Sequence, residues 1–384
     1  TARKDAERRT GVKNPQLIVV GGGVGGAAVA LRAAQYDLQT VWILGDRETH
    51  RASRAAYVMN IDNMIGIHPA IVQGKAAEML RADAPDAATK VEDAHMHIST
   101  QDLIDNARAR ITSEYSEHVR QVEDRVDSVH PTDGRFRVTT AKGETLEAAS
   151  VVLSTGVMDR QPVIHRKRGD RDLSGIQWVF PYANHEALLY CIRCEGHLTR
   201  GRRVAVIGSG IEAAEVALMI RERYDSDVVL LTAGETQTWN EERNRLLELE
   251  GVTVHHGKLV DIHGGDRGAA LRGFTLEGGE DVDVEFAFVS MGLHRVYNDL
   301  ARAVGAELEA TDAPIEVRHV LVDRNGETSV PGLFAVGDMT RRRDEPVMKQ
   351  IYTVQEYAVR AVDTIDRRRR RAYRKSLLAE ETER

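Results

Sequence analysis

The feature that most constrains the fold is an apolar strand that runs directly into a glycine-rich turn and then into a helix. Residues 16–20 are Gln-Leu-Ile-Val-Val, and residues 21–26 are Gly-Gly-Gly-Val-Gly-Gly. An alanine-rich helix is predicted over residues 27–35 and a second buried strand over residues 40–44. Strand, turn, helix and strand in this order predict a βαβ unit with parallel strands that are buried on both faces.

The same pattern occurs again in the middle of the chain. Residues 203–207 predict a strand, residues 208–213 (Gly-Ser-Gly-Ile-Glu-Ala) a glycine turn, residues 214–221 a helix and residues 227–231 the next strand. Further strands that end in glycine are predicted at 151–156, 286–292 and 332–338. Two βαβ units this far apart predict an α/β protein with two Rossmann-like nucleotide-binding domains, each with three layers (ββα).

The glycine turns are candidate dinucleotide sites. A strand that ends in Gly-x-Gly-x-x-Gly brings backbone N–H groups and a helix N-terminus against a pyrophosphate, and a Cβ atom would block that approach. The predicted residues of the first turn are Gly21, Gly23 and Gly26, with Asp46 as the acidic side chain that can hold a ribose. Those of the second turn are Gly208, Gly210 and Ala213, where alanine replaces the last glycine. A turn that only packs a helix on a strand is the alternative at both places, and it carries more weight at the second.

The segment after the second turn lacks the residues that usually bind NADPH. A site for the 2′-phosphate normally places arginine just beyond the second strand. Residues 232–238 contain no lysine or arginine. Glu235 would repel a phosphate there, although it could accept a hydrogen bond from the 2′-hydroxyl of NADH.

The only two cysteines, Cys191 and Cys194, are the chemical centre of the chain. On a helical turn, residues three apart have Cβ atoms close enough for a disulfide that opens and recloses with little backbone movement. The arginine between them, or a helix N-terminus, would lower a thiol pKa, and the thiolate is the attacking species in disulfide exchange. Glu195 could move the proton that each half-reaction requires.

Two other interpretations of the cysteines remain open. Zinc could be held by Cys191, Cys194, His197 and His185, although a second Cys-x-x-Cys or a regular histidine pair is missing. Alternatively the cysteines could be buried and inert, which leaves their position between two nucleotide-type folds unexplained.

Composition excludes several classes of protein. The chain has 384 residues and a net charge of -7, which argues against general affinity for nucleic acid or an anionic membrane. Residues 17–31 form the longest uncharged apolar stretch and are too short and glycine-rich to span a bilayer. Two cysteines exclude a disulfide scaffold, and no leader pattern opens the sequence, so a cytoplasmic location is expected.

The order of these motifs resembles the low-molecular-weight thioredoxin reductases from residue 16 to residue 366. The order is glycine turn, Ser-Thr-Gly, Cys-x-x-Cys-acidic-Gly, second glycine turn, Gly-Asp and C-terminal helix. The resemblance implies a discontinuous FAD domain built from residues 1–160 and 330–384. It also implies a central pyridine-nucleotide-like domain, residues 161–329, that carries the redox cysteines.

The resemblance also assigns individual residues. Gly21, Gly23 and Gly26 match the FAD pyrophosphate turn, and Asn63 lies in a segment, residues 60–66, that resembles the family's Glu-Val-Glu-Asn-Trp-Pro-Gly. The other implied flavin contacts are Gly156, Gly337, Asp338, Lys349, Gln350 and Ile351. By the same comparison Cys194 is the thiol next to the flavin, Cys191 attacks the partner, and Glu195 is the acid.

The departures from the family define the expected function. The family's His-Arg-Arg, which binds NADPH phosphate, is replaced by residues 232–235, so the chain resembles branches that keep the cysteines without using NADPH. We therefore expect a homodimeric FAD enzyme that exchanges electrons between flavin, the cysteine pair and a thioredoxin-type partner, with reduced ferredoxin as one candidate donor. The alternatives are an NAD(P)H-dependent thioredoxin reductase, a flavin oxidase of small dithiols, and a redox-sensing flavoprotein without turnover.

Two further expectations concern the ends of the central region and of the chain. Domain rotation is expected about residues 196–201 and 330–332. A helix is predicted from about Met348 to Ile365, followed by a frayed polar tail from Arg367. The arginines of this tail, with Arg341, Arg342 and Arg343, are a candidate docking patch for an acidic electron carrier. Alternatively, Tyr373 in the tail could cover the flavin, or the tail could be only a solvated helix end.

Overall fold

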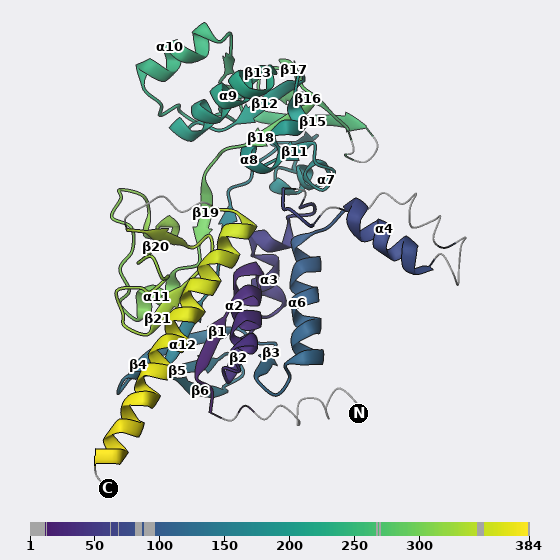
Figure 1. Cartoon of the computed structure of the whole chain (residues 1–384). Coiled ribbons are helices and arrows are strands. Elements are labelled where there is room, and N and C mark those ends of the chain that lie inside the picture. The colour runs from purple at the N-terminus through teal and green to yellow at the C-terminus, as the bar shows by residue number, and fades with distance from the viewer. Residues whose placement is uncertain are drawn as a thin grey trace. The chain divides into compact units, whose positions relative to one another are not determined.

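The computed structural model describes residues 12, 14–61, 63–67, 69–80, 87, 97–265, 268, 270–343 and 349–382. The chain forms two compact units (Figure 1). Unit 1 combines Thr1–Met158 with Arg295–Arg384, and unit 2 is Asp159–His294. A first domain built from both ends of the chain was predicted, with a central segment of 161–329.

Residues 295–329 lie with unit 1 instead of the central segment. Close to the boundary, Tyr297 ties this segment to unit 1. Its N–H donates to the Gly156 carbonyl (3.1 Å), and its carbonyl accepts from the Thr155 hydroxyl (2.6 Å). The chain crosses between units at β8 (Val157–Asp159) and β19 (Leu293–Val296), which pair as a two-stranded sheet. The segments expected as hinges lie inside the units: residues 196–201 are in unit 2 and residues 330–332 in unit 1.

Unit 1 is organised around a five-stranded parallel sheet. Its strands, in spatial order, are β21 (Leu333–Ala335), β7 (Ser150–Leu153), β1 (Leu17–Val20), β2 (Thr40–Ile43) and β3 (Val119–Val122). Because β21 pairs with β7, the C-terminal part of the chain completes the N-terminal sheet. The predicted strands at both ends of the chain are confirmed.

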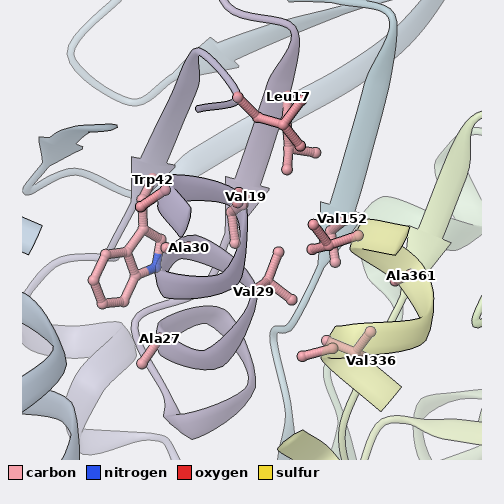
Figure 2. Packing of buried hydrophobic residues seen from close by; sticks show 14 of the residues in the cluster. Leu17, Val19, Ala27, Val29, Ala30, Trp42, Val152, Val336 and Ala361 are labelled. Atoms are coloured by element: carbon pink, nitrogen blue, oxygen red, sulfur yellow. The ribbon is translucent and has the colours of Figure 1, made fainter. Parts of the chain in front are cut away.

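Three helices cover one face of this sheet: α2 (Val24–Gln35), α6 (Thr100–Glu114) and α12 (Ile351–Thr382). Figure 2 shows Val29 and Ala30 of α2 among side chains of the strands, with Ala361 of α12 nearby. Small alanines let α2 approach the sheet and α12 closely. The other layer is an antiparallel sheet of β4 (Val126–Thr132), β5 (Arg135–Thr140) and β6 (Thr145–Ala148), which packs on the parallel strands.

Unit 2 repeats this plan. Its parallel sheet has the order β11 (Leu188–Leu189), β18 (Phe286–Val289), β12 (Arg203–Ile207), β13 (Asp227–Leu231) and β14 (Thr253–His255). The antiparallel layer is β15 (Leu259–Gly265), β16 (Ala270–Leu276) and β17 (Asp281–Asp283). The helical side carries α9 (Ile211–Tyr224) and α10 (Glu241–Leu249). The predicted α/β class with two Rossmann-like parallel sheets is confirmed.

Strand β12 shows why these strands are apolar throughout. Val204 and Val206 pack against α9, whereas Ala205 and Ile207 pack against the antiparallel layer. Both faces of the strand are buried, so alternation of polar and apolar residues is absent.

Shorter elements complete the units. In unit 1 they are α3 (Arg47–Arg51), η1 (Arg54–Ala56), α4 (Pro69–Leu80), α11 (Asp299–Ala303), η5 (Ile315–Val317), β20 (Val320–Val322) and β22 (Thr340–Arg342). In unit 2 they are β9 (Lys167–Arg168), β10 (Arg171–Asp172), η2 (Ile176–Trp178), α7 (Phe180–Ala183), α8 (Ile192–Glu195) and η3 (Gly196–Thr199). Among the described residues, no helix is both long and apolar enough to cross a membrane.

The C-terminal region differs from the prediction. Helix α12 continues without a break to Thr382, so the expected frayed tail from Arg367 was wrong; Met348, the predicted start, lies outside the described residues. Arginine, alanine, lysine and leucine are good helix formers, and Asp366 pairs with Arg369 and Arg370 one turn away (3.2 and 2.7 Å). The second half of the helix is exposed.

Candidate active site

The two cysteines form a disulfide at the start of a short helix in unit 2. Cys191 is the N-cap of α8 and is bonded to Cys194, with a Cα–Cα distance of 5.2 Å. The Cys191 Sγ also accepts a hydrogen bond from the Cys194 N–H at 3.2 Å. Both cysteines are half-buried. A zinc site would need both sulfurs as thiolates, whereas here they are joined to each other.

Glu195 holds the backbone just before this disulfide. One oxygen of its carboxylate, Oε2, accepts hydrogen bonds from the Tyr190 and Cys191 N–H groups, each at 3.0 Å. Hydrogen bonds to a charged acceptor are among the stronger ones in proteins. The side chain therefore fixes the segment that presents Cys191, and its role as a proton donor stays a prediction.

Tyr190 is a half-buried polar neighbour that the sequence did not indicate. Its hydroxyl donates to the Gln161 side-chain oxygen at 2.5 Å. Burial raises the pKa of Tyr190 well above its ordinary value, and the charge of Asp159 raises it further. The phenol therefore stays protonated and supports the strand that leads into the cysteines.

The first glycine turn has the form of an anion cradle. Gly21 has a φ of 121°, which favours glycine, and a Cβ there would overlap the Ser154 carbonyl. Gly23 is the N-cap of α2 with no side-chain cap, and the nearest atom to a Cβ placed on it is the Ala55 Cβ at 4.0 Å. The N–H groups of the first turn of α2 and the open space in front of Gly23 fit the pyrophosphate of a dinucleotide such as FAD.

Asp46 has a structural task in the folded chain. It is the N-cap of α3, and its Oδ1 accepts from the Glu48 and Thr49 N–H groups at 3.0 and 2.8 Å. The Thr49 hydrogen bond lowers the pKa of Asp46, although burial opposes the shift. The predicted contact of Asp46 with a ribose stays a prediction.

Several predicted flavin contacts lie together in unit 1, although they are far apart in the sequence. The Asn63 side chain donates from Nδ2 to Oε1 of Gln350 at 2.9 Å. Asp338, next to Gly337, pairs with Arg54 at 2.5 Å, a partner that the sequence did not reveal. These contacts bring the residue 63 segment, the Gly-Asp motif and the start of α12 into one unit.

The remaining predicted flavin contacts flank this group. Lys349 Nζ lies 2.9 Å from His319 Nε2, directly before Ile351 opens α12. Burial lowers the pKa of His319, and the charge of Lys349 lowers it further. Gly156 and Gly337 both have positive φ, 74° and 84°, at the ends of β7 and β21.

The second glycine turn is covered by its own chain. Ser209, between Gly208 and Gly210, donates from its hydroxyl to Glu235 Oε2 at 2.8 Å. The Ser209 carbonyl accepts from the N–H of Thr238 at 2.8 Å. Glu235 is also paired with Arg160, a residue that the sequence did not single out. Ala213 is buried in α9 below the turn.

Two parallel sheets, each with a strand, a glycine turn and a helix, together with a disulfide at a helix start, define a nucleotide-binding redox protein. The chain belongs to the pyridine nucleotide-disulphide oxidoreductase family, whose model matches residues 15–361. This is a family of oxidoreductases, as the sequence predicted.

Curated relatives are longer than this chain. The F component of the alkyl hydroperoxide reductase of Staphylococcus aureus is 27% identical over 246 residues, which cover 63% of this chain and 44% of that protein. NADH dehydrogenase of Bacillus subtilis is 28% identical over 329 residues, covering 84% of this chain and 53% of that protein. The chain thus spans about half the length of the curated relatives it matches.

Solved structures share the fold over almost the whole chain. The crystal structure of HlmI has a TM-score of 0.71 at 22% identity and covers 96% of both chains. A putative thioredoxin reductase, TrxB, from Bacillus anthracis has a TM-score of 0.68 at 16% identity, covering 94% of this chain and 99% of that one. At these identities the similarity establishes the fold.

Proposed function

We propose that this protein is an FAD-dependent disulfide oxidoreductase that exchanges electrons with a thioredoxin-type partner through Cys191 and Cys194. The observation that carries the proposal is the disulfide at the N-terminus of α8. Family membership and the resemblance to thioredoxin reductases support the choice of cofactor and partner. The cradle at Gly23 supports a dinucleotide in unit 1.

The sulfur chemistry follows from the positions of the two cysteines. FAD, when bound and reduced, would supply two electrons. Delivered at Cys194, they would break the S–S bond and release Cys191 as a thiolate. The Cys194 N–H, which donates to the Cys191 Sγ at 3.2 Å, would stabilise that negative charge. Cys191 then attacks the partner's disulfide; Cys194 in turn attacks Cys191, which releases the partner as a dithiol and restores the internal disulfide.

Glu195 and the second glycine turn define the rest of the proposal. Glu195 keeps Cys191 in place through its two backbone hydrogen bonds and, once it has taken up a proton from solvent, can pass it to a leaving thiolate. The absence of arginine or lysine from residues 232–238 favours a donor other than NADPH, with reduced ferredoxin as the candidate. The proposed assembly is a homodimer, which light scattering would test.

Anaerobic titration of the flavin-loaded protein tests the donor. NADPH, NADH and reduced ferredoxin are added in turn while the flavin absorbance is followed. We expect bleaching with ferredoxin and none with NADPH within seconds. Rapid bleaching by NADPH would contradict the donor assignment and favour an ordinary NADPH-dependent reductase.

Single cysteine variants test the disulfide route. Cys194→Ser should lower thioredoxin reduction at least about a thousandfold, because no internal disulfide can form. The matched control is His197→Ala, three residues further on and exposed, which should keep the rate. Full turnover by Cys194→Ser would refute the route, whereas loss of both turnover and bound zinc in His197→Ala would favour the metal interpretation.

A further inference from the structure

Glu235 is the acidic residue that follows β13 in unit 2. Both of its carboxylate oxygens contact other side chains of the same unit. Oε2 accepts from the Ser209 hydroxyl at 2.8 Å and lies 3.4 Å from Arg160 Nη1, while Oε1 is paired with Arg160 Nη2. Two parallel contacts of this kind are the bidentate geometry that arginine forms with carboxylates. The carboxylate is therefore directed at the turn and is neutralised by one guanidinium.

Arg160 is held in place at the other end of this contact. Its backbone N–H donates to the Gly292 carbonyl at 3.0 Å, directly after β8. On the side of the turn, Thr238 donates its N–H to the Ser209 carbonyl at 2.8 Å. The segment that follows β13 is thereby folded back onto the glycine turn from two sides.

The roles of a carboxylate and of an arginine near the ribose are known for dinucleotide folds in general. A carboxylate at this position accepts from the 2′-hydroxyl of a nicotinamide dinucleotide, and an arginine nearby accommodates a 2′-phosphate. Residues 232–238 contain no arginine, so a basic group has to come from elsewhere in the chain. Arg160 supplies one, brought to the turn by folding and invisible in the local sequence.

We propose that the Arg160–Glu235 pair determines which nucleotide the second turn accepts. While paired, the two side chains satisfy each other and leave neither a ribose acceptor nor a phosphate donor. Without Arg160, Glu235 accepts the 2′-hydroxyl of NADH and repels the 2′-phosphate of NADPH. Without Glu235, Arg160 binds that phosphate. The proposal rests on the assignment of unit 2 as a dinucleotide domain.

A surface ion pair without a role is the plain alternative. Arg160 and Glu235 are 47% and 29% exposed in their side chains, and exposed pairs contribute little to stability. Such a pair, when broken, would change NADH and NADPH binding equally or leave both alone. A gain confined to NADH in one variant and to NADPH in the other is expected only from a specificity pair.

The experiment measures binding of NADH and NADPH by calorimetry to the flavin-loaded protein and two variants. Arg160→Ala should bind NADH at least about fivefold more tightly than the unchanged protein, with NADPH still weak. Glu235→Ala should bind NADPH at least about tenfold more tightly, with no gain for NADH. The double variant should lose the preference for either nucleotide.

The control is Arg202→Ala, which removes another exposed ion pair of unit 2, with Glu285 at 2.8 Å, at the opposite end of β12 from the glycine turn. It should leave both affinities unchanged. The proposal is overturned if the two nucleotides respond in parallel in Arg160→Ala and Glu235→Ala, or if neither variant differs from the unchanged protein. Circular dichroism establishes that each variant is folded. Because direct binding is measured, the result is independent of thioredoxin turnover, which tests the proposed function.

Discussion

The two glycine turns of this protein follow the same order of elements but are packed differently. In unit 1 the last glycine, Gly26, lies against the Gly21 carbonyl, and the indole of Trp42 donates to that same oxygen at 2.9 Å. In unit 2 the last motif position is Ala213. Trp42 is paired with Val19 in unit 1, and the residue at the same strand position in unit 2 is Leu230, which is paired with Val206. The first turn is thus fixed by backbone contact and one indole, the second by the side chains of Glu235 and Ser209.

The comparison teaches that a similar motif does not imply an equally available site. The first turn leaves the space in front of Gly23 open, with no side-chain cap on α2. The second turn is contacted by the segment after its second strand. Under the proposed function, a ligand would meet open space at the first turn, whereas at the second it would have to displace internal contacts.

The largest effect is expected where the two turns differ in their last residue. Gly26→Ala copies the alanine of the second turn, yet its Cβ would overlap the Gly21 carbonyl and lie 3.0 Å from Trp42 Nε1. We expect a loss of about 2–3 kcal/mol in the free energy of unfolding, measured in urea, and reduced FAD content. In the second turn Gly210→Ala, at the middle motif position, should cost under about 1 kcal/mol, since its Cβ would meet only the flexible end of Glu212. Equal costs at the two sites would break the comparison.

The indole contact is the next test. Trp42 is fully buried, and Trp42→Phe leaves the Gly21 carbonyl without this donor. The expected cost is about 2 kcal/mol in the free energy of unfolding, from the lost hydrogen bond and the smaller ring. An unchanged urea midpoint would show that the first turn does not need the indole.

A smaller effect, with a pH signature, is expected at Asp46. Asp46→Ala removes the N-cap of α3 and should cost about 1 kcal/mol near pH 7. The Asp46 pKa is lowered in the folded protein by the Thr49 hydrogen bond. The stabilisation is therefore complete above the ordinary aspartate pKa and is lost as the pH falls through the lower folded value. The difference between the proteins should shrink in acid; a constant difference would exclude the carboxylate as its source.

The smallest effect on stability is expected for Glu235→Ala. Its exposed ion pair with Arg160 should contribute less than about 1 kcal/mol to the free energy of unfolding at moderate salt. Unfolding in urea at low and high salt measures this contribution. A loss as large as that of Asp46→Ala would mean that the pair holds unit 2 together, and it would weaken the case for a role in nucleotide selection.

The sheet strands could be predicted closely because burial on both faces leaves a clear apolar run. Residues 203–207 and 227–231 are β12 and β13 as predicted. Helix α2 begins at Val24, earlier than the predicted residue 27, because Gly25 and Gly26 belong to its first turn. The continuation of α12 was missed because its dense positive charge was interpreted as fraying, whereas Asp366 and Glu327 pair with its arginines.

The site could be predicted only where its residues are neighbours in the sequence. The spacing of Cys191 and Cys194 allowed the disulfide that the structure has, although zinc and inert cysteines were open alternatives. Arg54 with Asp338, and Arg160 with Glu235, join distant parts of the chain, so no local pattern indicates them. The arginines proposed as a docking patch are partly paired as well: Arg341, Arg342 and Arg343 each contact a glutamate of unit 1. Tertiary folding decides which charges remain available.

Helix α12 is a single rod from Ile351 to Thr382, about 48 Å long at 1.5 Å per residue. Its first residue follows Gln350, which holds Asn63, while its last turns extend past the core into solvent. Because Ala361 and Ile365 anchor the first half of the helix in the core of unit 1, a force on the outer end would act on that core before it reached the segment beside Asn63.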